Sequence, residues 1–308
     1  MLELNKKYQF FGKVNLMDVS TYETYPINVT TEKNEVVIVR IKQDQKVELN
    51  KVYLFETIAI EFKEKIHLEA IQFTIIDEVA LDDKRKEKLM KFFYEYAPIK
   101  ISDIKKDIEH MMSLIENPVI REITAHIYHL HKNDFYLYPA ASKFHHAYIS
   151  GLAYHTHSML QLARGFLKVY TYLNYDLMVS GIILHDICKI FEFSSYENSE
   201  YTLKGKLIGH ITMGVKLIHE VAISLGYQEK EEVMLLEHIL LSHHYYGNFG
   251  SPKKPNIAEA LMIHYIDNID SKACVLGEEL DLISEGELTR VMPVLDRERY
   301  YKHHLTKK

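Results

Sequence analysis

A histidine and an aspartate stand side by side at the end of an apolar segment in the middle of the chain. The segment covers 179–189 and contains His185 and Asp186, with Lys189 one helical turn beyond the histidine. A neutral imidazole nitrogen and a carboxylate oxygen can share one divalent cation, so this pair suits a metal site at the end of a buried helix. The pair alone does not define a site; the number of other donors decides.

Five further donors lie on both sides of this pair, at positions expected to face inward or to end a helix. They are His155, His210, His243, His244 and Asp267. Burying so many imidazoles and carboxylates is costly unless a cation compensates them, which favours a metal centre over a set of ordinary core residues. His238, five residues before His243, is a rival ligand that the sequence does not exclude.

We expect the seven donors to hold one or two divalent ions. The hypothesis groups His155, His185, Asp186 and Asp267 around one ion and lets Asp186 bridge to a second ion held by His210, His243 and His244. Two neighbouring ions would polarise a phosphodiester and lower the pKa of a bridging water for in-line attack. Asp186 and Lys189 are then the expected catalytic residues, with the lysine neutralising a phosphate oxygen. The alternative for Lys189 is a helix-terminal lysine stabilised by the helix dipole.

Two other features near these donors invite a chemical interpretation. Cys188 follows Asp186 closely, but a cysteine nucleophile needs a base with its own orienting group, so we do not expect it to act as one. The loop 247–255 follows the histidine pair and carries Lys253 and Lys254, which could bind substrate phosphates. The alternative is a proline-rich surface connection.

The elements that must position these residues change character near residue 80, which predicts an α+β chain. Four segments before that point read as strands, at about 8–16, 35–41, 52–60 and 67–76, with turns at 31–34 and 48–51. They fit a small antiparallel barrel of about five strands, with an OB-fold as the natural candidate. Residues 1–80 carry more acidic than basic side chains, so a structural or docking role competes evenly with nucleic-acid binding.

Beyond residue 80 the apolar spacing becomes helical. We predict a barrel domain at 1–80, a helical linker region at 81–138 that packs on the metal-binding domain, and that domain at 139–308. Breaks are expected at Asn174, around 193–201, at Gly226 and across 247–255. The dense basic run at 84–91 reads as a solvated face, with an RNA-backbone contact as the minority interpretation.

Composition limits the class of protein. A chain of 308 residues with 47% hydrophobic residues can bury a large core, and its net charge of −6 offers no overall basic field for nucleic acid. Two cysteines exclude a disulfide framework. The N-terminus lacks the order of a signal peptide, and no apolar run reaches the roughly 18 residues of a membrane span, so we expect a cytoplasmic protein without membrane association.

Several short sequence motifs around the metal donors, and not only the donors themselves, match those of a known family. They are Pro-Ala-Ala-Ser at 139–142, Phe-His-His at 144–146, Ser-Gly-Leu-Ala-Tyr-His at 150–155, Ser-Gly-Ile-Ile-Leu-His-Asp-Ile at 180–187, the run 201–210, Leu-Ser-His-His at 241–244, Gly-Ser-Pro-Lys at 250–253 and His-Tyr-Ile-Asp-Asn-Ile-Asp at 264–270. Over about 100–303 the chain resembles the YhaM-type 3′–5′ exoribonucleases, an HD-domain family that joins an N-terminal OB-fold to a C-terminal HD domain.

This resemblance implies metal-assisted removal of nucleotides from the 3′ end of single-stranded RNA, with single-stranded DNA as a further candidate substrate. The implied metal is Mn²⁺ or Co²⁺; Mg²⁺ and Fe²⁺ also remain candidates. Cys188 departs from the family's usual glycine and could crowd Lys189, while Tyr245 and Tyr246 replace a small, basic pair. Tyr245 could supply an aromatic stack for a terminal base or narrow the mouth of the site.

Two alternatives remain open at this point. One is an HD phosphohydrolase of free or cyclic nucleotides, and the other is a non-catalytic RNA-binding or scaffold protein whose metal is structural. Exposed barrel edges and the aromatic-rich linker are compatible with a homo-oligomer without requiring one.

Overall fold

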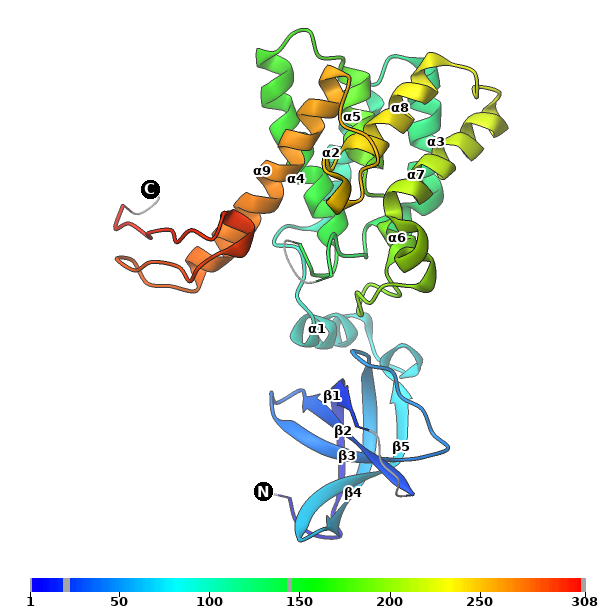
Figure 1. Ribbon diagram of the computed structural model, residues 1–308. Coiled ribbons are helices and arrows are strands. Elements are labelled where there is room, and N and C mark those ends of the chain that lie inside the picture. The colour runs from blue at the N-terminus through cyan, green and yellow to red at the C-terminus, as the bar shows by residue number, and fades with distance from the viewer. Residues whose placement is uncertain (1, 19–22, 143–145, 306–308) are drawn as a thin grey trace. The chain divides into compact units, whose positions relative to one another are not determined.

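The computed structural model divides the chain into two compact units, residues 1–96 and 97–308 (Figure 1). It describes residues 2–18, 23–142 and 146–305, so Phe144 and His145 of the Phe-His-His word lie outside the described residues. The region 81–138 of the sequence-based division is shared between the units: its first helix belongs to the first unit, and its other two helices belong to the second.

Five strands close the barrel of the first unit. They are β1 (Lys7–Met17), β2 (Thr24–Thr31), β3 (Val36–Lys42), β4 (Val52–Phe62) and β5 (Lys65–Ile75). Their order around the barrel is β1-β2-β3-β5-β4, with β3 and β5 parallel and the other pairs antiparallel. This confirms the expected OB-like barrel and the α+β class. A short 3-10 turn, η1 (Ile76–Glu78), and helix α1 (Asp83–Phe93) follow the last strand.

Aromatic side chains of the barrel serve mainly as core. Phe55 is fully buried, and the partly buried Phe10 stacks on it with ring centroids 5.7 Å apart. Phe62 differs, because its ring lies under the guanidinium of the buried Arg40 at 3.7 Å. The hydrophobic core of the barrel therefore accounts for Phe10 and Phe55, whereas Phe62 contacts a buried cation.

Helices build the second unit around one buried helix. Their bounds are α2 (Ile101–Ser113), α3 (Pro118–Phe135), α4 (Gly151–Val169), α5 (Tyr175–Leu184), α6 (Lys189–Glu192), α7 (Leu203–Leu225), α8 (Glu231–Ser242) and α9 (Ala258–Asp281), with 3-10 turns η2 (Gly247–Phe249) and η3 (Pro293–Leu295). Helix α5 is buried along nearly its whole length and contacts α3, α4, α8 and α9. The expected breaks at Asn174, 193–201, Gly226 and 247–255 all fall between helices.

Helix α7 is long and apolar enough to cross a membrane by length and composition alone. It is interrupted by non-helical backbone at Gly209, and it packs against α3, α6 and α8 within the unit. These contacts explain its apolar residues as one side of a protein core.

Candidate metal centre

Five helices and one turn bring the predicted donors together. His155 lies in the first two turns of α4, His185 caps the C-terminus of α5, and Asp186 follows in the turn before α6. His210 lies on α7, His243 and His244 follow the end of α8, and Asp267 lies in the middle of α9. Most donors therefore sit at helix ends or beside breaks, where a side chain can leave the regular helical spacing.

The non-helical backbone at Gly209 interrupts α7 and orients His210. Its backbone has φ 76° and ψ 156°, a conformation essentially restricted to glycine. As a result, both the backbone amide and Nδ1 of His210 reach the carboxylate of Glu192, at 3.1 Å and 3.0 Å. The ring's other nitrogen, Nε2, then lies 3.2 Å from Asp186 Oδ1.

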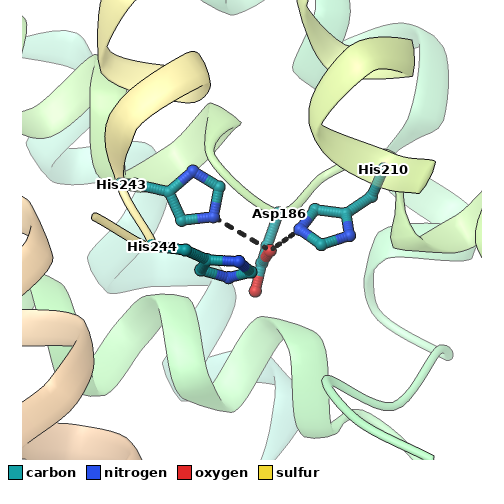
Figure 2. Close-up of side chains that lie close together, drawn as sticks. All are labelled: Asp186, His210, His243 and His244. Carbon is teal, nitrogen blue, oxygen red and sulfur yellow. Dashed lines mark ion pairs between the residues drawn. The ribbon is translucent and has the colours of Figure 1, made fainter. Parts of the chain in front are cut away.

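Asp186 is the shared centre of two groups of donors. The first consists of Asp186, His210, His243 and His244, whose ligand atoms all lie within 4.8 Å of one another. Figure 2 shows the rings of His210 and His243 directed at the Asp186 carboxylate, with His243 Nε2 3.8 Å from Oδ1. The second consists of His155, His185 and Asp186, again within 4.8 Å.

Asp267 extends the second group, because its Oδ1 lies 3.4 Å from Nε2 of His155. Asp186 Oδ2 lies 3.3 Å from Nε2 of His185 and 3.9 Å from Nε2 of His155. The structure thus brings the seven predicted donors into one cluster, arranged as two sets that meet at Asp186. The role of each donor as a ligand stays a prediction.

Unsatisfied polar atoms indicate what this cluster requires. Four buried atoms at its centre have no hydrogen-bond partner among the described residues: His185 Nε2, Asp186 Oδ1, His210 Nε2 and His243 Nε2. Leaving such groups without a partner in a protein interior costs about 1–3 kcal/mol each. Imidazole nitrogen and carboxylate oxygen are good ligands of divalent transition metals, so a bound cation would satisfy all four atoms.

In four of the cluster histidines, Nδ1 has an oxygen partner, which in His210 is Glu192. Nδ1 lies 2.7 Å from Asp270 Oδ2 in His155, 2.7 Å from the Ile182 carbonyl in His185, and 2.8 Å from the Leu240 carbonyl in His243. In His185 and His243, donation from Nδ1 to the carbonyl places the lone pair on Nε2, the nitrogen directed at the cluster. This is how metal-binding histidines are usually oriented.

The charges at the centre are strongly coupled. Burial raises the pKa of Asp186, but Lys189 and His185 more than offset it and hold that pKa well below its usual range. Burial lowers the pKa of His155, yet hydrogen bonds with Asp267 and Asp270 raise it to about 9. Burial lowers the pKa of His243 well below its usual range, so its ring is neutral and able to coordinate a metal.

Lys189 faces the same centre. Its Nζ lies 2.6 Å from Asp186 Oδ2, and it opens the short helix α6, where a helix dipole does not stabilise a cation. The carboxylate of Asp186, and not a helix dipole, therefore compensates the charge of Lys189. Cys188 leaves this contact intact: it is buried, and burial raises the pKa of its thiol to about 12, which keeps it protonated.

A cavity of about 520 Å³ opens on the cluster. Its wall consists of Ala140, Ala141, Ser142, Asp186, Lys189, Glu192, Phe193, Tyr201, His210, His244, Asp267, Asn268 and Ser271. Donors from both sets thus face one space, and Lys189 contributes a cation to it. A phosphate ester held there would contact the cluster and the lysine at the same time.

The predicted substrate-binding residues lie outside the wall of this cavity. Among the residues that the structure describes, Tyr245, Lys253 and Lys254 are not part of the cavity wall. Instead, the Lys254 ammonium lies 5.2 Å from the centre of the Tyr245 ring, which packs against His264 at 5.1 Å. Their contact with substrate stays a prediction.

His238 belongs to none of the donor groups found among the described residues. Its Nε2 accepts a hydrogen bond of 2.9 Å from the backbone amide of Asn256. His238 therefore binds the segment that follows the loop 247–255, whereas His243 and His244 lie in the donor cluster.

Three residues around the donors were missed by sequence reasoning. Asp270 Oδ2 lies 2.7 Å from both His155 Nδ1 and His146 Nε2, and Glu192 binds His210. Asp270 lies one turn beyond Asp267 on α9, so helical spacing could have found it. His146 lies in the Phe-His-His word at 144–146, but no role was assigned to it. The contact of Glu192 with His210 depends on the packing of distant segments, and the sequence carries no local signal for it.

Comparison with protein families agrees with this geometry. The family model described as "HD domain" matches residues 152–272, a range that contains all seven donors and Asp270. HD domains are typical of metal-dependent phosphohydrolases. The helical unit therefore contains an HD domain whose donor clusters fit a divalent metal, preceded in the chain by an OB-like barrel.

Proposed function

We propose that the chain is a metal-dependent 3′–5′ exoribonuclease that hydrolyses single-stranded RNA, with single-stranded DNA as a second substrate. The observation that carries the metal-dependent part is the set of four buried atoms without hydrogen-bond partners among the described residues, gathered around Asp186 beside a cavity. The sequence words shared with YhaM-type enzymes support the specific choice of substrate.

The residues have separable tasks in this proposal. His155, His185, Asp186, His210, His243, His244 and Asp267 would hold one or two divalent ions, Mn²⁺ being the first to test. Such ions supply a hydroxide near neutral pH and polarise the phosphate. Lys189 stabilises negative charge on a phosphate oxygen, and Asp270 and Glu192 keep His155 and His210 oriented.

The barrel supports a polymeric substrate. OB-like barrels commonly bind single strands. In this barrel the aromatic side chains are mainly core and residues 1–80 are net acidic, so the support comes from the fold class. A cavity of about 520 Å³ is also large enough for a single nucleotide unit. The same cavity would admit a free nucleotide, so phosphohydrolysis of free or cyclic nucleotides is the second candidate.

A substrate panel separates these candidates. Purified protein is incubated with Mn²⁺ and RNA labelled at its 5′ end, and the products are resolved at single-nucleotide spacing. We expect a ladder that shortens from the 3′ end, and the same protein to leave nucleoside triphosphates and cyclic nucleotides unchanged. Hydrolysis of the free nucleotides without a ladder would replace the exoribonuclease by the second candidate. No hydrolysis of any substrate would leave a binding or scaffold role.

A further inference from the structure

One edge of the cavity continues into an exposed surface that the proposed function has not yet used. Tyr201 lines the cavity and is 44% exposed, and the next turns of α7 expose Leu203 and Leu207 at 74% and 75%. Large apolar side chains that reach this exposure side by side mark an interaction site more often than chance. Their position places this site directly at the cavity.

The backbone around Tyr201 is well fixed. Tyr201 forms an antiparallel bridge with Phe193, and the Thr202 amide donates to the Glu192 carbonyl at 2.9 Å. The Tyr201 ring also packs against the buried ring of Phe193, with centroids 5.3 Å apart. These contacts fix the orientation of the Tyr201 ring while nearly half of the residue stays exposed, which suits a ring on which a base stacks.

The charge of this surface is positive. Lys204 and Lys206 are both exposed, as is Glu200 directly before Tyr201, so two lysines against one glutamate leave residues 200–208 with a net charge of +1. Glu192, whose carbonyl accepts the Thr202 amide, also lines the cavity, and its side chain is buried and engaged with His210. In a chain with net charge −6, such a basic segment beside a phosphate-binding cavity favours a polyanion over an acidic or neutral partner.

We propose that residues 201–208 are the landing surface for the single strand whose 3′ end occupies the cavity. Tyr201 stacks on a base at the mouth, and Lys204 and Lys206 contact backbone phosphates of the nucleotides that remain outside. Aromatic platforms next to basic side chains are the usual means of binding single strands without sequence preference. This inference rests on the proposed function and assigns the substrate contacts to α7 instead of the loop 247–255.

Base stacking is tested with Tyr201→Ala, Tyr201→Phe and the control Tyr172→Ala, which removes an exposed tyrosine elsewhere in the same unit. Each variant receives oligonucleotides with normal bases and oligonucleotides that lack the last or the penultimate base. We expect Tyr201→Ala to raise KM for the normal strand about tenfold, and to have little effect on the strand that lacks the stacked base. Tyr201→Phe and Tyr172→Ala should keep the normal KM.

Phosphate contacts are tested with the double variant Lys204→Ala/Lys206→Ala. The control is Lys168→Ala/Lys216→Ala, which removes the same charge from two exposed positions. Each single-strand phosphate contact contributes about 0.7 to the slope of log KM against log salt concentration, so the test variant should lose about 1.4 of slope. The control should keep the slope of the unmodified protein.

The outcomes separate this inference from the proposed function. If the intact protein shortens RNA but both test variants match their controls, the landing surface is wrong and the exoribonuclease stands. If the intact protein shortens no strand, direct binding of the oligonucleotides is measured by fluorescence anisotropy. Equal binding by Tyr201→Ala, Lys204→Ala/Lys206→Ala and the intact protein would then overturn the landing surface independently.

Discussion

Asp270 Oδ2 lies 2.7 Å from Nδ1 of His155, on the side of the ring that faces away from Asp186. The same oxygen lies 2.7 Å from Nε2 of His146. Burial raises the pKa of Asp270, but its hydrogen bonds with His146 and His155 lower that pKa to about 2, so the group is a carboxylate at neutral pH. One carboxylate thus fixes the ring of a predicted ligand without belonging to the cluster around Asp186.

Replacing this carboxylate should weaken metal binding. Outer partners of ligating histidines typically contribute 10–100-fold to metal affinity, so we expect Asp270→Asn to raise the Kd for Mn²⁺ by about that factor. Isothermal titration calorimetry measures it directly. Asp281→Asn, at the exposed end of the same helix, is the matched control. An unchanged Kd in Asp270→Asn would show that the hydrogen bond to His155 has no role in metal binding.

Gly209→Ala should damage the same centre through the backbone. A Cβ at this position would have enough space, since its nearest neighbour is Glu192 Oε1 at 3.8 Å, so the cost comes from the backbone conformation. We expect a loss of about 1–3 kcal/mol in the free energy of unfolding, together with weaker metal binding as His210 shifts. Denaturant unfolding and calorimetry provide the two measurements.

The matched control for that variant is Gly165→Ala on α4. Its Cβ would meet nothing within 4 Å, and glycine is unfavourable inside a helix, so this variant should be stabilised by about 0.4–1 kcal/mol. Equal effects of the two substitutions would contradict the conformational account of Gly209.

Lys189 provides a test of catalysis separate from metal binding. Because its ammonium contacts Asp186 and lines the cavity, Lys189→Met should lower kcat by roughly 10²–10³-fold through loss of charge stabilisation in the transition state. Metal affinity should not fall, since a competing cation next to Asp186 is removed. A variant with normal kcat would return Lys189 to a purely structural role.

The metal-free protein should lose stability as the pH rises above neutrality. The pKa of His155 is about 9 in the folded chain, against an ordinary value of 6.5, so its contribution is complete below pH 6.5 and is lost as pH rises towards 9. We expect Tm in EDTA to fall by roughly 2–4 °C or more over this window.

Comparison with His155→Gln isolates this contribution from other titrating groups. His243 acts in the opposite direction, because its lowered pKa stabilises the chain above pH 6.5 and the effect is lost as pH falls. The pH dependence of Tm between 6.5 and 9 should therefore flatten in the His155 variant. An unchanged profile would show that His155 does not carry a raised pKa.

The sequence predicted the donors because each belongs to a local pattern: His155 shares a helix face with Leu152 and Met159, and Asp186 ends a buried helix. Four strands of the barrel were found for the same reason. β2 was not predicted, because Pro26 argues against a strand even though Tyr25, Ile27 and Val29 alternate as in one; pairing with β1 and β3 stabilises it. The motif at 144–146 contains His146, but its contact with Asp270 and that of Glu192 with His210 join residues distant in sequence and could not be predicted.

The central claim is that the cluster around Asp186 binds the metal used for phosphodiester hydrolysis. The most direct test compares the intact protein with Asp186→Ala, measuring bound Mn²⁺ by elemental analysis after gel filtration and hydrolysis of single-stranded RNA in the same samples. We predict that the variant keeps its helical circular dichroism but loses both bound metal and hydrolysis. Retained hydrolysis in the folded variant would contradict the account.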